Sequence, residues 1–252
     1  MRYYILESGS KGNSTLIASQ NRYLLIDDGI AKTAFKSYLS QIDVSVSELS
    51  VVLVTHSHGD HTKGLDVFDR RCIYATEPTW KDLDEEHTLV PYRTYRLNGF
   101  KVTVVPTSHD ARGSVGFIIE DGEEKLVYMT DTGYIYERVL DYIRDADYYI
   151  FEANHDVRMQ LSSGRPQYLI DRIMGDMGHL SNEDSALYLS EVISQRTKEI
   201  VLAHLSEEAN TPESALEAFY KIMNKRGVDV SSINVRCAKQ KEMVCGGHLM
   251  KI

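Results

Sequence analysis

The 252-residue sequence contains only three cysteines, and their spacing matches no metal or disulfide framework. Cys72, Cys237 and Cys245 are an odd number without a CxxC pair, so neither disulfide staples nor a thiolate zinc site is indicated. We interpret them as reduced structural thiols. No charged-then-apolar pattern opens the chain, and no apolar run reaches the roughly 18 residues of a membrane span. These absences predict a cytoplasmic protein that does not associate with membranes.

Positive charge is also scarce. The chain has 28 Lys and Arg residues against 37 Asp and Glu residues, which gives a formal net charge of -9. A broad basic surface that holds nucleic acid by releasing counterions is therefore excluded. A nuclease whose metal ions and a local basic rim contact the phosphates remains compatible with this balance.

No repeat, low-complexity tract or linker interrupts the sequence, so residues 1–252 are expected to form one domain. Runs of β-branched and aromatic residues predict strands at 3–6, 15–18, 23–26, 51–54, 102–105, 116–120, 126–129, 148–151 and 200–203. Apolar residues at three- and four-residue steps predict helices at 31–41, 63–70, 134–144, 182–195 and 212–225. Hairpins mixed with helical crossovers indicate an α/β protein with sheets covered by helices.

The densest group of metal-binding residue types is the run THSHGDH, which follows an apolar stretch ending at Val54. His56, His58, Asp60 and His61 would be unsatisfied polar groups in an ordinary loop, whereas two adjacent divalent cations would engage all of them. Alternate histidines at a strand end point the same way, and the later Asp and His can turn toward a second site. The run predicts a metal-dependent hydrolase.

Other ionisable residues fall at the downstream ends of predicted strands. They are Asp27, His109, Asp131, His155 and His204. If these strand ends converge on one rim, side chains from distant positions would meet the histidine-rich loop in one cleft. Each residue alone would more often have a structural role, but the repeated position favours a shared site.

Four segments resemble the metallo-β-lactamase superfamily: the HxHxDH run, TSH ending at His109, TDTG at Asp131 and LAHLS at His204. The pieces SGSKGNST, LLIDDG, SHDA, EANHD, GHLSN and LAHLSEEAN are more specifically similar to the YycJ/WalJ branch of bacterial exonuclease-like proteins. The resemblance runs from about Ser8 to Glu208. It implies a four-layer αββα sandwich, in which two mixed β-sheets are flanked by helices and metals lie at one edge.

The resemblance also implies a ligand set for two divalent cations. One would be held by His56, His58 and His109, the other by Asp60, His61 and His204, and Asp131 would bridge them. Two cations about 3.5 to 4 Å apart would share a hydroxide nucleophile, which makes Asp60 and Asp131 catalytic candidates. Zn²⁺ is the expected metal, with Mn²⁺ or Fe²⁺ as alternatives, because histidine and carboxylate ligands accommodate all three.

Two further strand-end residues are expected to support this site. Asp27 is interpreted as a residue that orients a histidine or the loop, because coordinating imidazoles need their other nitrogen held. Asp28 could compete for this role but falls outside the matching position. His155 is a candidate to contact substrate or metal, or to brace the site.

His179 precedes Ser181 and Asp184, which suggest a capping box for the helix beginning near Asn182. The histidine either packs at this helix start or protonates a leaving oxygen while a phosphate occupies the helix N-terminus. The segment GHLS resembles the stretch that supplies a phosphate-contacting histidine in tRNase Z. This favours a catalytic and substrate-binding role for His179.

The loop from Ser8 to Ser14 is the remaining candidate for substrate contact. Its small residues would let the backbone approach a phosphate, and Lys11 adds positive charge. It lacks the GxxxxGK[ST] pattern, which excludes a nucleotide-binding P-loop. A plain hairpin connection and a substrate-facing loop, with contacts from Ser10, Lys11 and Asn13, both remain open.

The favoured function is cleavage of phosphodiester bonds by a two-metal hydrolase, and the YycJ/WalJ resemblance implies a 5′-to-3′ DNA exonuclease. The same ligands serve hydrolysis of a small phosphodiester, thioester or lactone, which the acidic charge favours somewhat. An iron-dependent sulfur oxygenase would use the same histidines with a single iron, whereas a noncatalytic binding module would have lost one or more ligands. The chain is too short for a β-CASP insertion, and no long exosite arm of the tRNase Z kind is evident.

Overall fold

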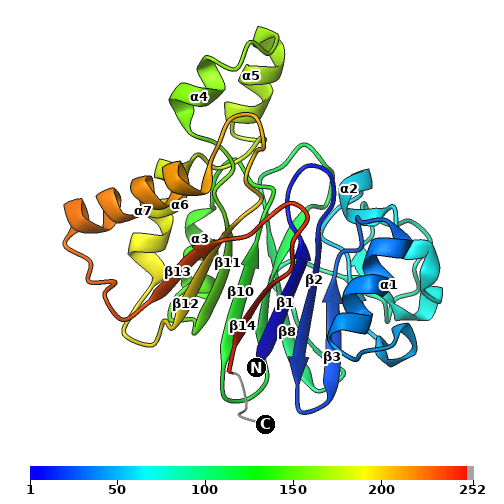
Figure 1. Cartoon of the computed structure of the whole chain (residues 1–252). Helices are drawn as coiled ribbons and strands as arrows, with labels where there is room; N and C mark the ends of the chain where they lie inside the picture. Colours follow the sequence, from blue (N-terminus) through cyan, green and yellow to red (C-terminus); the bar gives the residue numbers. More distant parts are fainter. Residues whose placement is uncertain (249–252) are drawn as a thin grey trace.

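The first of two β-sheets is built from the N-terminal part of the chain and one C-terminal strand. The structure is a computed structural model that describes residues 1–248 (Figure 1). In spatial order the strands are β14 (Val244–Gly247), β1 (Arg2–Glu7), β2 (Ser14–Ser19), β3 (Arg22–Ile26), β4 (Val52–Leu53), β5 (Ile73–Thr76) and β6 (Thr88–Leu89). Pairing is antiparallel from β14 to β3 and parallel from β3 to β6.

The second sheet contains the strands whose ends carry most of the predicted ligands. In spatial order it comprises β13 (Asn234–Cys237), β12 (Glu199–Ala203), β11 (Tyr148–Glu152), β10 (Lys125–Met129), β9 (Val115–Glu120), β8 (Phe100–Pro106) and β7 (Thr94–Leu97). Strands β10 to β13 are parallel, so their carboxyl ends lie at the same edge. Strands β7 to β10 are antiparallel.

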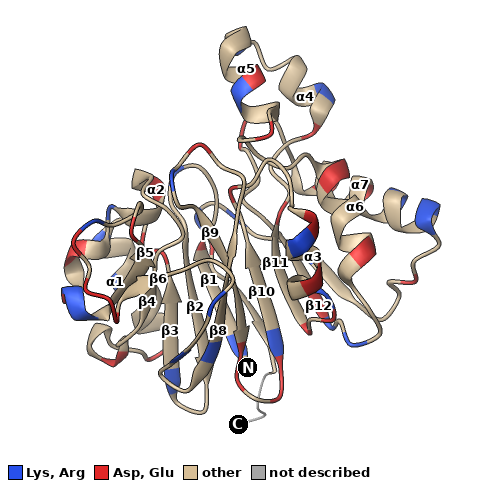
Figure 2. Cartoon of the chain, turned by 180° about the vertical axis from the view of Figure 1, so that it is seen from behind, with Lys and Arg blue, Asp and Glu red and all other residues tan. Residues whose placement is uncertain are grey.

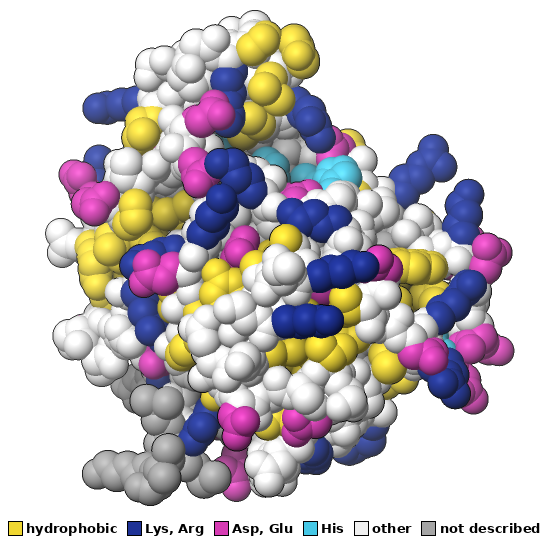
Figure 3. Space-filling view, turned by 45° about the vertical axis from the view of Figure 1, so that its right-hand side comes forward, with side chains coloured by type: hydrophobic (Ala, Val, Ile, Leu, Met, Phe, Trp, Pro, Cys, Tyr) yellow, Lys and Arg dark blue, Asp and Glu magenta, His cyan; other side chains and the backbone are white. Residues whose placement is uncertain are grey.

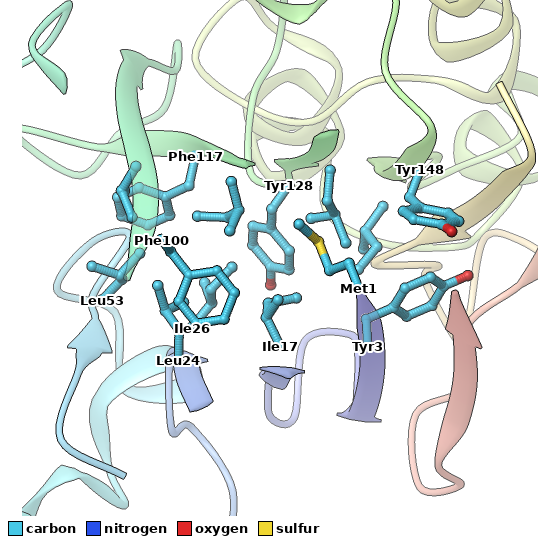
Figure 4. Packing of buried hydrophobic residues seen from close by; sticks show 14 of the residues in the cluster. Met1, Tyr3, Ile17, Leu24, Ile26, Leu53, Phe100, Phe117, Tyr128 and Tyr148 are labelled. Atoms are coloured by element: carbon cyan, nitrogen blue, oxygen red, sulfur yellow. The ribbon is translucent and has the colours of Figure 1, made fainter. Parts of the chain in front are cut away.

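The two sheets face each other across the main hydrophobic core. Because side chains alternate along a strand, Leu24 and Ile26 of β3 point into this core while Leu25 points to the outer face. Figure 4 shows the two sheets meeting, with Phe117 and Tyr128 packed toward residues of the first sheet. Burial of these large apolar side chains is the main force that holds the sheets together.

Helices complete the outer two layers. Helix α1 (Lys32–Gln41) packs on the first sheet through buried apolar residues, and α3 (Glu137–Ile143), α6 (Asn182–Val192) and α7 (Pro212–Arg226) pack on the second. The one-turn helix α2 (Gly59–Thr62) lies in the histidine-rich loop, and α4 (Val157–Leu161) and α5 (Gln167–Met174) project from the body (Figure 1). The αββα sandwich is thereby confirmed. Within residues 1–248, the helices are too short or too polar for one to span a membrane.

The nine predicted strands are confirmed, but five short strands, β5, β6, β7, β13 and β14, were not predicted from the sequence. They are two to four residues long, and β7, β13 and β14 are largely half-buried or exposed, so their apolar alternation is weak. The predicted helix at 63–70 is wrong. A 3₁₀ turn, Leu65–Val67, and the start of a second, Arg70–Cys72, form there, because the chain folds back at Gly64, whose N–H donates to the carbonyl of Asp28.

The inter-sheet core should dominate stability. Phe117 is 0% exposed in this core, and replacing it by Ala should lower the free energy of unfolding by about 3 to 5 kcal/mol. Urea denaturation followed by circular dichroism measures the loss. Tyr220 on α7 is 46% exposed, so Tyr220→Ala should change stability by about 0.5 kcal/mol or less. Equal effects for the two variants would contradict the assignment of the core.

Candidate metal centre

The predicted strand-end residues converge at one edge of the sandwich. Asp27 follows β3, Asp131 follows β10 and His204 follows β12, and their φ angles are 58°, 58° and 56°. This left-handed conformation is rare for residues with a side chain and costs on the order of 1 kcal/mol or more per position. The left-handed conformation falls at or just beyond the end of each strand, where side chains stop alternating between the two faces of the sheet. Such strained positions concentrate where function requires a particular side-chain placement.

Three imidazole nitrogens form the first cluster. His56 Nε2 lies 3.1 Å from His58 Nδ1, which in turn lies 3.3 Å from His109 Nε2. Three nitrogens at these distances cannot all be satisfied by hydrogen bonds to one another. Nitrogen lone pairs that point inward are therefore left close together. A divalent cation is the natural partner of three converging imidazole nitrogens.

The second cluster lies beside the first and shares Asp131 with it. Asp131 Oδ2 is 3.4 Å from His61 Nε2, Asp131 Oδ1 is 3.6 Å from His204 Nε2, and Asp60 Oδ2 is 3.7 Å from His61 Nε2. The same oxygen, Oδ1, also lies 3.9 Å from Nε2 of His109, a member of the first cluster. Asp131 therefore lies between the two clusters, as a bridging ligand requires.

Two buried atoms of this cluster lack hydrogen-bond partners among residues 1–248. They are Asp131 Oδ2 and His204 Nε2. An unpartnered buried polar atom is costly, and both residues belong to groups whose potential ligand atoms lie within 4.8 Å of one another. The donor set fits two divalent cations, with His56, His58 and His109 on one side, Asp60, His61 and His204 on the other, and Asp131 between them.

Asp27 fixes the histidines of the first sheet from behind. Its Oδ2 accepts hydrogen bonds from His61 Nδ1 at 2.7 Å and from Thr55 Oγ1 at 2.8 Å, and Oδ1 accepts from the Thr55 N–H at 2.8 Å. Thr55 Oγ1 also lies 3.0 Å from His56 Nδ1. The carboxylate thus faces the outer nitrogen of His61 and leaves Nε2 turned inward.

Glu152, which sequence reasoning missed, has the matching position on the second sheet. Its Oε1 accepts hydrogen bonds from His179 Nδ1 at 2.8 Å and from His204 Nδ1 at 3.0 Å. Its Oε2 accepts from the N–H groups of Thr132 at 3.0 Å and Leu180 at 3.2 Å. Because both oxygens are engaged and the side chain is fully buried, Glu152 orients the two rings and is not free to bind a cation.

The signal for Glu152 was present at the end of the run YYIFE, where a carboxylate closes a strand that is otherwise apolar. The histidine of the following EANHD segment carried the more conspicuous pattern. His155 itself is 1% exposed and its lowered pKa, about 4, results from burial. It pairs with Ser181 through an isolated β-bridge, a position suited to bracing.

Electrostatics in the cluster follow from burial and close opposite charges. Burial acts to raise the pKa of Asp131, but the neighbouring His204, His61 and His56 hold it well below its usual range. Burial also opposes the charged forms of His61 and His204, yet Asp131 raises the pKa of both to about 9, with help from Asp27 and Glu152 respectively. These protons balance the buried carboxylates, and a divalent cation would displace them.

The loop at 8–14 braces the site more than it faces solvent. Asn13 is fully buried, its N–H donates to Asp60 O at 2.8 Å, and its Nδ2 lies 3.0 Å from His61 Nε2. Lys11 is exposed and forms an ion pair with Glu207. Ser10 lines the pocket described below. Of the three predicted substrate contacts, Ser10 and Lys11 are accessible and Asn13 is not.

The expected phosphate site at the start of α6 is not supported. Ser181 caps the helix, with its Oγ accepting from the Asp184 N–H at 3.1 Å. Ser181 and Asn182 are both buried, and Glu183 and Asp184 place negative charge in the first turn. A phosphate would meet a closed helix end and two carboxylates there.

An open pocket of about 200 Å³ leads to the cluster. It is lined by Ser10, His109, Asp110, Asn154, Arg165, Leu169, Arg172, Ile173, Gly178, His179, His204 and Ser206. His179 is 19% exposed in its side chain, and its ring stacks on that of His204 with 5.2 Å between centroids. Since Glu152 holds Nδ1, the Nε2 atom of His179 is left for a ligand in the pocket.

A match to a protein-family model shows the superfamily to which the chain belongs. The model for the beta-lactamase superfamily domain matches residues 22–205, which include every predicted cation ligand. The chain belongs to the beta-lactamase superfamily.

Within this superfamily, two curated relatives match over most of the chain. The chain is 34% identical over 244 residues to exodeoxyribonuclease YycJ of Bacillus anthracis, covering 91% of this chain and 92% of the relative. It is 35% identical over 228 residues to exodeoxyribonuclease WalJ of Streptococcus pneumoniae, covering 85% of each. The resemblance to the YycJ/WalJ branch is confirmed.

Solved superfamily structures agree in fold at low sequence identity. The metallo-β-lactamase fold protein YhfI from Bacillus subtilis aligns with a TM-score of 0.66 at 16% identity, over 97% of this chain and 99% of that one. The short form of human tRNase Z aligns with a TM-score of 0.62 at 16% identity, over 97% and 98%. These likenesses establish the shared sandwich.

Removing the charge of Glu152 should loosen the centre without opening the fold. In Glu152→Gln, the side-chain shape is kept but the neutral amide no longer holds the Nδ1–H groups of His179 and His204 as strongly. The affinity for Zn²⁺ should fall about 10- to 100-fold, as is typical when such a partner of a metal ligand is lost. Competition with a chromophoric chelator measures this. Glu123→Gln, at an exposed position, is the matched control, and equal affinities for both variants would contradict the role of Glu152.

Proposed function

We propose that this superfamily member is a two-metal exodeoxyribonuclease that degrades DNA in the 5′-to-3′ direction. The observation that carries the proposal is the group of ligand atoms around Asp131, two of whose residues, His109 and His204, line a pocket together with His179. The almost full-length relatives named exodeoxyribonuclease support DNA as the substrate.

The cations would be held by His56, His58 and His109 on one side, by Asp60, His61 and His204 on the other, and by Asp131 between them. When bound, they would lower the pKa of water and neutralise charge that develops on the phosphate. Zn²⁺ is the proposed metal, with Mn²⁺ or Fe²⁺ as alternatives for these nitrogen and oxygen donors.

The protein's own contribution to the reaction centres on His179. Glu152 accepts a hydrogen bond from Nδ1 and orients the ring, so that Nε2, when it carries a proton, directs this proton into the pocket. We assign this proton to the oxygen that leaves when the phosphodiester bond breaks. Glu152 also holds His204, so one buried carboxylate positions the proton donor relative to a cation ligand.

Reduced thiols fit a cytoplasmic location, which is part of the proposal. Cys72, Cys237 and Cys245 are all free. DNA in that compartment would be accessible to the enzyme. Hydrolysis of a small diester, thioester or lactone would use the same ligand atoms, so the assay for the nuclease includes these substrates.

Loss of the bridging carboxylate should abolish nuclease activity. Asp131→Ala removes the group between the two clusters, and Asp131→Asn keeps its size and tolerates the left-handed backbone. Stepwise release of nucleotides from a 3′-labelled DNA, with Zn²⁺ or Mn²⁺ added separately, should fall to background in both variants. Circular dichroism should remain that of the wild type.

The same assay includes RNA, bis(p-nitrophenyl) phosphate, a cyclic nucleotide, a glutathione thioester and a lactone. Metal-dependent shortening of DNA from its 5′ end supports the proposal. Efficient turnover of the thioester, lactone or cyclic nucleotide without DNA degradation, or full DNA degradation by both Asp131 variants, would overturn it.

His179→Ala should slow the chemistry while leaving metal binding in place. A general acid contributes roughly 100- to 10,000-fold, and the loss should be greatest for a poor leaving group. Rates with p-nitrophenyl and alkyl phosphodiesters of thymidine, together with elemental analysis, test this prediction. A loss of the same size for both leaving groups would argue that His179 does not supply the proton.

A further inference from the structure

Residues 157–178 form a projecting segment that we call the arm. It consists of α4, α5 and their connections, and it leaves the body between His155 and His179 (Figure 1). Its two helices are short, and each contains one buried residue, Gln160 on α4 and Ile170 on α5. The arm stands directly beside the pocket without belonging to either helical layer.

The arm exposes an unusual amount of apolar surface. Among residues 1–248, the most exposed large hydrophobic side chains are Tyr168 at 74%, Leu161 at 58% and Met177 at 57%, and all lie on the arm. Apolar side chains gathered on a projecting element mark a contact surface more often than scattered ones do. Figure 3 shows hydrophobic side chains on this part of the molecule, with histidines at its foot and basic side chains nearby.

Two arginines connect the arm with the pocket. Arg165 and Arg172 line the pocket together with Leu169 and Ile173 of α5. Figure 2 shows basic positions on both α4 and α5. The chain is acidic overall, so positive charge at the pocket mouth is a local feature that suits a phosphate backbone.

Both arginines are paired with carboxylates that reach solvent. Arg172 Nε lies 2.6 Å from Asp110 Oδ2, and the two side chains are 58% and 28% exposed. Arg165 Nε lies 2.9 Å from Glu208 Oε2, and the two side chains are 20% and 67% exposed. Such pairs contribute only about 0 to 1 kcal/mol, so exchanging a carboxylate for a phosphate costs little. A guanidinium also binds a phosphate through two parallel hydrogen bonds.

An aromatic ring lies beside this charge. Tyr168 and Arg172 are four residues apart on α5 and therefore share a face of the helix. Aromatic rings that stack on bases, next to cations that contact the backbone, are the usual means of holding single-stranded nucleic acid.

We propose that the arm binds the single-stranded end of a DNA substrate and leads it to the metal centre. Tyr168 stacks on a base, and Arg165 and Arg172 contact the phosphates next to the bond that is cut. This inference rests on the proposed nuclease function. It adds the strand state of the substrate and the surface that holds it.

The test compares kcat/KM for a 3′-labelled single-stranded 12-mer with kcat/KM for bis(p-nitrophenyl) phosphate, which is too small to reach Tyr168. Tyr168→Ala removes one base stack and should therefore lower kcat/KM for DNA roughly 5- to 150-fold. Arg172→Gln should also be impaired, and each loss should be at least several-fold larger for DNA than for the small diester. Tyr220→Ala and Arg226→Gln on α7 are matched controls, since Tyr220 is also exposed and Arg226 is also ion-paired, with Glu191.

Salt dependence separates phosphate contacts from stacking. A plot of log affinity against log salt concentration should become shallower by about 0.7 for Arg172→Gln, the contribution of one contact to a single strand. The slope should be unchanged for Tyr168→Ala, which loses affinity at every salt concentration. Affinity is measured by fluorescence anisotropy of a labelled 12-mer with the Asp131→Asn variant and with double variants in that background.

The outcomes distinguish the two proposals. If the wild type shortens DNA and the arm variants match the α7 controls, the arm proposal is overturned and the nuclease proposal stands. A wild type that prefers blunt duplex to single strands would likewise overturn the strand assignment. If the wild type hydrolyses the small diester but no DNA, the nuclease proposal fails and the arm proposal fails with it.

Discussion

Compensation of three buried carboxylates is the constraint on which the architecture of the site depends. Asp27, Asp131 and Glu152 are almost or completely inaccessible to solvent, and an unpaired buried carboxylate is prohibitively costly. Neighbouring histidines lower the pKa of Asp131 and Glu152 despite their burial, whereas burial raises the pKa of Asp27 against the hydrogen bonds that it accepts from His61 and Thr55. The histidines must therefore converge on the carboxylates, and strands that carry them must end at one edge.

The arrangement is divided between the two sheets. Asp27 follows a strand of the first sheet and orients His61, whereas Glu152 ends a strand of the second sheet and orients His204 and His179. Asp131 lies where the two sets meet. Because each ligand cluster draws residues from both sheets, the inter-sheet core, packed by residues such as Phe117, also sets the distances between ligands within each cluster.

Sequence reasoning reached the parts of the fold that carry strong local patterns. The histidine-rich run and the ionisable residues at strand ends predicted which side chains the structure brings together, and long apolar runs predicted the central strands. Glu152 was missed because a glutamate at the end of an apolar strand looks like an ordinary solvent-facing terminus. Its role depends on Leu180 and His179, which only the tertiary fold brings near.

The other differences between the sequence predictions and the structure had similar physical causes. The helix expected at 63–70 had suitable apolar spacing, but tertiary contacts at Gly64 favour a turn. Asn13 looked like an accessible loop residue, yet its hydrogen bonds to the histidine-rich loop bury it. Helices α4 and α5, which are five and eight residues long, were not predicted, although the apolar residues of α5 recur at helical spacing.

The long sequence separation of the ligands has a consequence for biosynthesis. His56 leaves the ribosome early, but His204 and the strand β12 that positions it are made only when most of the chain has been synthesised. The Ser8 Oγ atom then accepts a hydrogen bond from the His204 N–H at 2.9 Å, which joins the first loop of the chain to the last ligand. Until then the nascent polypeptide lacks the candidate ligand His204, so we expect the proposed hydrolytic activity to appear only after most of the chain has been synthesised.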